Sequence, residues 1–144
     1  MKPKFTNRDA ARRLNVLGID HVVLLDGADT GGALTLLEAV IPPGLGIPPH
    51  VHTREDEVFH VLNGQVEFAV AGSRRLVNPG ETVFGPRDVT HGFSSSEGAT
   101  MLIVVQPAGL ERMLAELAQL GAGPPDVARL SEIVGRQGIR FAQP

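Results

Sequence analysis

Between Ile19 and Gln106 the chain consists of short apolar segments that are interrupted repeatedly by Gly, Pro, Asn and Asp. Helical periodicity is missing from this stretch, and such a pattern is typical of an all-β sandwich or barrel. Asn63-Gly64 is the clearest hairpin signal, because a type I′ turn requires positive φ at both central residues. The segments expected to form strands are Ile19–Leu25, Ala33–Ile41, Val58–Leu62, Gln65–Ala71 and Thr100–Gln106, with shorter ones between them.

The pattern changes after Pro107, where apolar side chains recur at helical spacing up to Leu120. Asp126 has the residue type of an N-cap and predicts the start of a second helix. These two amphipathic helices are expected to cover one face of the strands or to form a subunit contact. The expected organisation is one domain over residues 1–144, with a barrel at about 18–107 and the two helices at about 109–138.

Composition narrows both the chemistry and the partners. The chain has no Cys, Tyr or Trp, so disulfides and thiolate ligands are excluded and an acid or base must come from other side chains, His above all. A net charge of −3 does not favour binding to nucleic acid. The polar N-terminus lacks the apolar region of a secretory signal, and no apolar run is long enough to span a membrane. We therefore expect a cytoplasmic protein that binds neither nucleic acid nor membrane.

His50-Val51-His52 is the most informative triplet for function. Residues i and i+2 of a strand point to the same face, so two imidazoles can bind one ion. Neutral imidazoles suit Fe, Mn, Co, Ni, Cu and Zn. Taken alone, the pair is equally consistent with structural histidines that satisfy their polar atoms within strands.

A carboxylate and a third histidine complete the candidate site. The polar segment 53–56 predicts a turn, which resets the alternation of the next strand and lets Glu57 face the two histidines. On an unbroken strand Asp56 would share the side of His52, and it is therefore the rival carboxylate. His91 can reach the same ion only if the sheet folds back on itself, as closed antiparallel barrels allow.

Two runs of spacings are shared with a known family. The first run is Gly44, five residues, His50, one residue, His52, four residues, Glu57, six residues, Gly64. The second run is Gly80, five residues, Pro86, one residue, Asp88, two residues, His91, three residues, Ser95. From about Gly18 to Gln119 the chain resembles small single-domain cupins of the quercetin 2,3-dioxygenase-like kind. Asp88 and Ser95 replace the usual Gly and Asn, and Asp tolerates the left-handed conformation of the turn.

The resemblance implies a double-stranded jelly-roll β-barrel and a homodimer. It also implies that one divalent transition metal (Fe, Mn, Ni, Cu, Co or Zn) is bound by His50, His52, Glu57 and His91. Phe59 lies two residues beyond Glu57, and Phe93 lies two residues beyond His91. Both aromatic side chains should point toward the metal as walls of a substrate pocket, although plain core packing explains them equally well.

The other two histidines in strands are interpreted as structural. His60 alternates with Glu57 and should face away from the metal, whereas His21 sits in an N-terminal strand with apolar neighbours.

Three functions fit such a site. The first is a dioxygenase-like oxidoreductase acting on a small oxygen-chelating organic substrate, in which the resemblance implies that Glu57 is also the catalytic base. The second is an oxygen-independent isomerase or cyclase, which lacks an identifiable base because spacing places none of Lys4, Asp20 and Glu38 near the metal. The third is a protein that binds a metal or a small ligand without catalysis.

Overall fold

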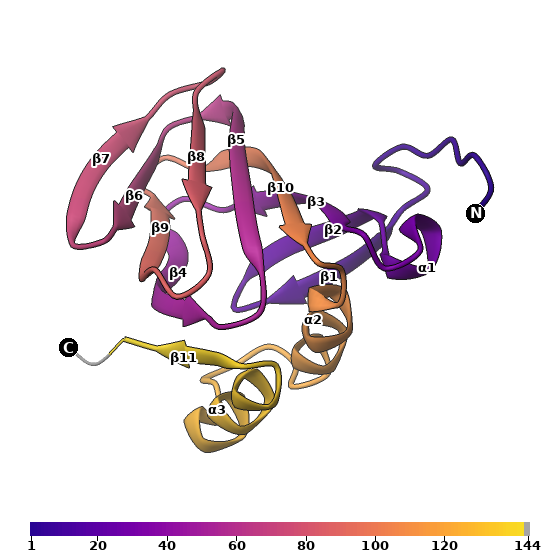
Figure 1. Ribbon diagram of the computed structural model, residues 1–144. Helices are drawn as coiled ribbons and strands as arrows, with labels where there is room; N and C mark the ends of the chain where they lie inside the picture. Colours follow the sequence, from indigo (N-terminus) through magenta and orange to yellow (C-terminus); the bar gives the residue numbers. More distant parts are fainter. Residues whose placement is uncertain (143–144) are drawn as a thin grey trace.

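The computed structural model describes residues 1–142, whose strands form two facing β-sheets above a pair of C-terminal helices (Figure 1). In the six-stranded sheet the order is β1 (Arg12–Val16), β2 (Ile19–Leu25), β3 (Thr35–Ile41), β10 (Ala99–Gln106), β5 (Asp56–Gly64) and β8 (Thr82–Gly85). In the five-stranded sheet the order is β11 (Ile139–Phe141), β4 (Leu45–His52), β9 (His91–Ser95), β6 (Val66–Val70) and β7 (Ser73–Val77). The helices are α1 (Gly27–Thr30), α2 (Leu110–Ala118) and α3 (Val127–Arg136).

The all-β expectation is confirmed, but the sheets do not close into a barrel. Among residues 1–142 no pairing of strands joins one sheet to the other. The apolar face of each sheet is instead buried against the other sheet, with Phe59 of β5 packed against Phe68 of β6 at a ring distance of 5.1 Å. This face-to-face packing encloses the core and the space in which the site lies.

The hairpin predicted at Asn63-Gly64 is wrong. β5 and β6 flank this turn but belong to different sheets, so the chain crosses the core there instead of reversing within one sheet. Gly64 has φ +73, and a Cβ at this position would lie 2.2 Å from the carbonyl oxygen of Gly98. A two-residue hairpin of this kind lies instead at Ala71-Gly72, where both residues have positive φ and β6 pairs with β7.

The N-terminal segment contributes a strand that the sequence pattern did not single out. β1 pairs with β2 through a turn at Leu17-Gly18, where φ is +53 and +82. β1 has only five residues and begins with two exposed arginines. Its composition therefore resembles that of a solvated terminus.

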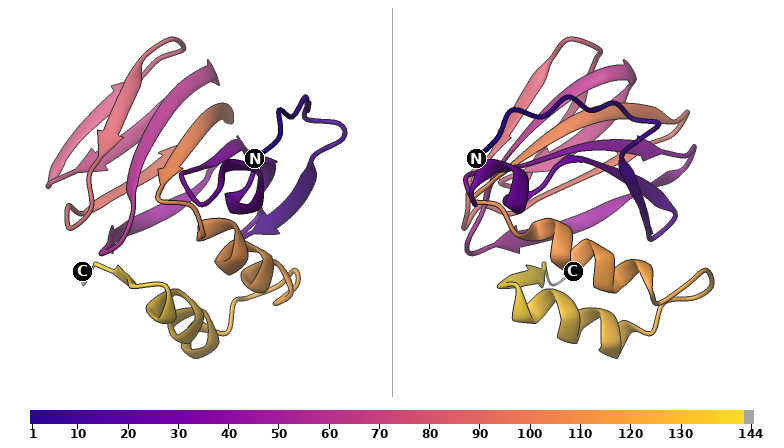
Figure 2. Two further views of the ribbon diagram at one scale, coloured as in Figure 1. Left: turned by 45° about the vertical axis from the view of Figure 1, so that its right-hand side comes forward. Right: turned by 90° about the vertical axis from the view of Figure 1, so that its right-hand side faces the viewer.

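Both C-terminal helices form where the periodicity predicts them. The Asp126 side chain accepts a hydrogen bond from Arg129 N and caps α3, as expected. Figure 2 shows α2 and α3 side by side beneath the sheets, with β11 returning from α3 to the edge of β4. Their buried side chains face the space between the sheets, so the helices cover one end of the core. No helix among the described residues is both long and apolar enough to cross a membrane.

Candidate metal centre

The structure brings together the four side chains predicted as ligands, His50, His52, Glu57 and His91. One potential ligand atom of each lies within 4.8 Å of the other three, and all four residues are buried. The Nε2 atoms of His50 and His52 are 3.1 Å apart, and Glu57 Oε2 lies 2.7 Å from His91 Nε2 and 3.4 Å from His52 Nε2. These donors converge on one point, as the ligands of a single ion do.

Three strands from both sheets supply the four side chains. β4 carries His50 and His52, β9 carries His91, and β5 carries Glu57 from the facing sheet. His50 is paired directly with His91 across β4 and β9. The site therefore spans the gap between the sheets, which explains how residues far apart in the sequence meet without a closed barrel.

The turn before β5 settles which carboxylate faces the site. β4 ends at His52 and β5 begins at Asp56, so the alternation is reset as the polar segment predicted. Glu57 is buried beside the histidines. Asp56 instead faces outward and accepts hydrogen bonds from the backbone N–H and guanidinium of Arg87 at 2.7 to 3.1 Å. That ion pair lowers the pKa of Asp56 to about 2 and keeps the rival carboxylate away from the cluster.

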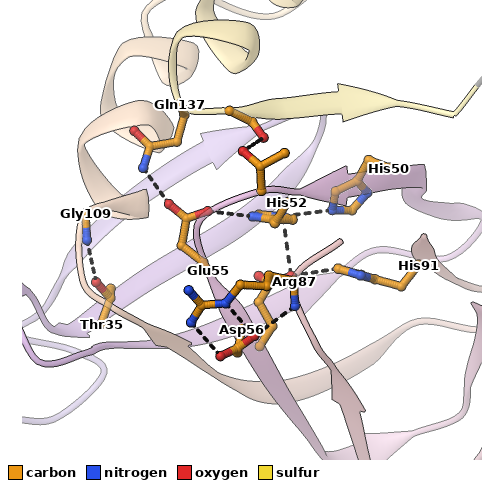
Figure 3. Close-up of polar contacts among 12 residues, drawn as sticks. Thr35, His50, His52, Glu55, Asp56, Arg87, His91, Gly109 and Gln137 are labelled. Atoms are coloured by element: carbon orange, nitrogen blue, oxygen red, sulfur yellow. Dashed lines mark hydrogen bonds and ion pairs between the residues drawn. The ribbon is translucent and has the colours of Figure 1, made fainter. Parts of the chain in front are cut away.

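Hydrogen bonds at the far ring nitrogens orient the three imidazoles. His50 Nδ1 donates to Pro48 O at 2.8 Å, and His91 Nδ1 donates to Val89 O at 3.2 Å. His52 Nδ1 donates to Glu55 Oε2 at 3.1 Å (Figure 3). Since each Nδ1 carries the hydrogen, each Nε2 can present its lone pair to the cluster. The donor set of three imidazole nitrogens and one carboxylate oxygen therefore fits a divalent transition metal.

Glu55 is a functional residue that sequence reasoning missed. It lies in the polar turn between β4 and β5, where a solvated side chain is the ordinary expectation, yet only 2% of it is exposed. Its second oxygen accepts a hydrogen bond from Gln137 Nε2 at 2.7 Å, just after α3 (Figure 3). The one available signal was its position three residues after His52, which suits a carboxylate that orients a ligand histidine.

Burial and charge act in opposite directions on the site. Burial lowers the pKa of His50 to about 4, which favours its neutral, lone-pair form. Burial also opposes the charged form of His52, but the hydrogen bond to Glu55 and the charge of Glu57 raise its pKa. For Glu57, burial raises the pKa, but the contact with His91 Nε2 and the nearby imidazole of His52 favour the carboxylate more strongly, so the pKa is lowered. The carboxylate therefore stays ionised in the core.

The segment around His91 accommodates the two residues that differ from the usual cupin motif, Asp88 and Ser95. Asp88 adopts φ +64, the left-handed conformation expected of a residue in the position of Gly. Its backbone N–H donates to His52 O at 2.7 Å, which ties this turn to β4. Ser95 is buried and donates from Oγ to Gln65 O at 2.7 Å.

A pocket lined by three of the four clustered side chains, His50, His52 and Glu57, extends toward the helices. Phe59 and Phe93 both line it. The ring of Phe59 also packs edge-on against the His91 ring, with 5.6 Å between the ring centroids. His21 lines the wall as well, although the sequence was interpreted as giving it a purely structural place. His60 faces away, as expected, and hydrogen-bonds to Thr82 Oγ1. Apart from His21 and the ligands, the lining is apolar and comes largely from α2 and α3, with side chains such as Leu110, Met113, Leu114, Leu117, Leu130 and Val134.

Comparison with known proteins places this arrangement in a family. Residues 37–106, which include all four clustered side chains, match the family described as "Cupin domain". The chain carries a cupin domain. Solved structures with the same fold include KdgF from Halomonas sp., with a TM-score of 0.69 and 20% identity, covering 77% of this chain and 99% of that one.

Two further relatives of this cupin domain are more similar in sequence. Germin-like protein 3-3 of Oryza sativa subsp. japonica is 32% identical over 120 residues, which cover 73% of this chain and 52% of the rice protein. The chain thus spans about half the length of the curated relatives it matches. The polyketide cyclase RemF from Streptomyces resistomycificus is 29% identical, with a TM-score of 0.63 and coverage of 75% of this chain and 81% of its own.

Proposed function

We propose that this protein is a metal-dependent enzyme that acts on a small, largely apolar organic molecule bearing oxygen donors. One observation carries the proposal: three of the four convergent side chains, His50, His52 and Glu57, line a pocket whose remaining lining is almost entirely apolar. A binding site of this kind takes an apolar body by burial and fixes its orientation through a few polar contacts.

The residues that would hold the metal are His50, His52, Glu57 and His91. A divalent transition metal held there would polarise a carbonyl group or, if redox-active, activate dioxygen. Phe59 and Phe93 would flank the substrate and exclude water, and the side chains of α2 and α3 would close the other end of the pocket. In a dioxygenase-like reaction, Glu57, which is ionised and lies beside His91, would also be the base.

For the reaction itself, an oxygen-independent cyclisation or isomerisation is the first candidate. The similarity to the polyketide cyclase RemF supports it, because that protein is 29% identical and the similarity covers 81% of its chain. The dioxygenase-like oxidation expected from the sequence is the second candidate, since the same nitrogen and oxygen donors suit redox-active Fe, Mn and Cu.

Turnover with and without oxygen tests the proposal. Apo protein would be loaded separately with Zn, Mn, Fe, Ni, Co and Cu, and each form incubated with phenolic ketones, 1,3-diketones and enediols while products and dissolved oxygen are followed. Equal turnover in air and under argon supports the first candidate, and oxygen consumption that matches product formation supports the second. Binding of these compounds without any turnover would contradict the proposal and leave a protein that binds metal or ligand without catalysis.

A further inference from the structure

The pocket wall contains one titratable side chain that is not a candidate ligand. His21 lies on β2, and β3 and β10 separate this strand from β5, which carries Glu57. Its neighbours on the same face of the strand, Ile19 and Val23, are buried, so the imidazole points into the space between the sheets. His21 itself is 5% exposed and lies outside the ligand cluster.

Hydrogen bonding assigns different roles to the two ring nitrogens of His21. Nδ1 donates to the carbonyl oxygen of Ile19 at 3.1 Å, and because a carbonyl can only accept, Nδ1 carries the hydrogen. Burial lowers the pKa of His21 and favours the neutral ring, in which Nε2 has a lone pair. The carbonyl oxygens of Ile19 and Leu14 both act on the ring, and among residues 1–142 the one hydrogen bond found for it is made by Nδ1 and none by Nε2. Nε2 is therefore the nitrogen available to a molecule in the pocket.

Because the surrounding pocket wall is apolar, Nε2 can select for ligands that carry a hydrogen-bond donor. Apart from His21 and the candidate ligands, the residues that line this pocket, among them Val16, Leu17 and Leu37, have no nitrogen or oxygen in their side chains. An isolated acceptor in such a wall favours a ligand with a matching donor and disfavours one without it, because the polar atom is then left unpaired. Lys4, Asp20 and Glu38, which spacing did not place near the metal, do not line the pocket either, and they pair with Asp29, Arg13 and Arg8.

We propose that His21 is the second polar contact of the substrate, whose hydroxyl group donates a hydrogen bond to Nε2 while its other oxygens lie at the ligand cluster. This inference rests on the proposed function and narrows the substrate to hydroxylated aromatic or enolic ketones. In an oxygen-independent reaction the same nitrogen takes the proton: the substrate O–H bond breaks, an N–H bond forms, and an enolate or phenolate remains beside an imidazolium. His21 is thereby the base of the oxygen-independent reaction, which could not be identified from the spacing of residues in the sequence.

Matched phenolic probes test the contact. The parent probe is 2-hydroxyacetophenone, which offers a phenol and a carbonyl oxygen to the metal, and the others are its isomers with one further ring hydroxyl. In Zn²⁺-loaded wild type, at least one isomer should bind about tenfold more tightly than the parent, as one added hydrogen bond to a buried acceptor allows. In His21→Phe, which keeps a flat ring of similar size, this gain should vanish while the parent binds unchanged.

A gain that persists in His21→Phe, or no gain for any isomer in wild type, would overturn the inference. Failure of the proposed function is a different result, in which the parent does not bind or binds metal-free protein equally well. If His21→Phe does not fold, NMR of the wild type decides. Long-range proton–nitrogen correlations should show Nδ1 protonated and Nε2 bare in His21, with the Nε2 signal moving on addition of an isomer but not of the parent. A protonated or unresponsive Nε2 would contradict the assignment.

Discussion

Glu55 lies outside the cluster of four candidate ligands, yet it orients the ring of His52. Its two oxygens join His52 Nδ1 at 3.1 Å to Gln137 Nε2 at 2.7 Å, so the carboxylate fixes the ring orientation and makes Nε2 a better donor. Because the side chain is buried, no water can take over this role without rearrangement.

Replacing Glu55 by Gln should therefore weaken the metal site. We expect Glu55→Gln to lower the affinity for Zn²⁺ by about tenfold, as loss of an outer carboxylate does in other metal sites. Competition with a chromophoric chelator measures this. The control is Glu97→Gln, which removes the same charge from an exposed loop. Equal affinities for the two variants would mean that Glu55 serves only to anchor Gln137.

At the scale of single residues, the sequence pattern indicated the candidate ligands but not the residue that orients one of them. The polar run after His52 was sufficient to indicate a turn and hence to favour Glu57 over Asp56. The same run concealed Glu55, because its burial depends on Gln137, which lies 82 residues away in the sequence. His21 was missed for a similar reason: the alternation of β2 places it inward, but only the helices beyond β10 show that it faces a pocket.

At the scale of elements, Glu111 joins α2 to the sheet and to α1. Its side chain accepts hydrogen bonds from Thr35 Oγ1 at 2.5 Å, Gly109 N at 2.9 Å and Gly27 N at 3.1 Å. Burial raises the pKa of this carboxyl, but these donors outweigh it and the pKa is lowered from 4.5. The carboxylate thus holds the start of the helix that covers the pocket.

Glu111→Gln should destabilise the protein by about 1–3 kcal/mol at neutral pH, because a charged acceptor of buried hydrogen bonds is lost. A lowered pKa contributes stability above the unfolded value of 4.5, and this contribution is lost as the pH falls through the folded value. The difference in unfolding free energy between wild type and Glu111→Gln should therefore shrink below about pH 4.5.

Urea denaturation at neutral and acid pH measures this difference. Glu132→Gln, on the exposed face of α3, is the control and should change the unfolding free energy by less than about 0.5 kcal/mol. A difference between wild type and Glu111→Gln that does not depend on pH would show that shape, and not charge, holds α2 in place.

Turn chemistry alone was insufficient to assign the hairpin. Asn63-Gly64 has the residues of a type I′ turn, yet the flanking strands pair with β10 and β9 in separate sheets. Ala71-Gly72 lacks the favoured Asn but makes the hairpin because β6 and β7 are adjacent in one sheet. The difference lies in tertiary pairing, which no short window of sequence contains. The helices, by contrast, follow from apolar spacing and the Asp126 cap, both of which are local.

For the whole molecule, the apolar segments between turn residues were enough to predict the all-β fold, and the resemblance to cupins implied that the four distant side chains meet. Neither could predict that the C-terminal segment completes the pocket, because this depends on where α2, α3 and β11 pack after the sheets have formed (Figure 2). β11 pairs Ile139 with His52 and so connects the end of the chain to a candidate ligand. The homodimer expected from the family resemblance stays a prediction, which light scattering of the purified protein would measure.

The binding of one metal by the four clustered side chains is measured most directly by titrating apo protein with Zn²⁺ in a calorimeter. His52→Ala removes one candidate ligand, and His60→Ala removes a histidine that faces away from the pocket. We predict about one ion per chain for wild type and for His60→Ala, and loss of this binding in His52→Ala, which should remain folded because the core is unchanged. Wild-type affinity in His52→Ala, or no binding by the wild type, would contradict the metal site.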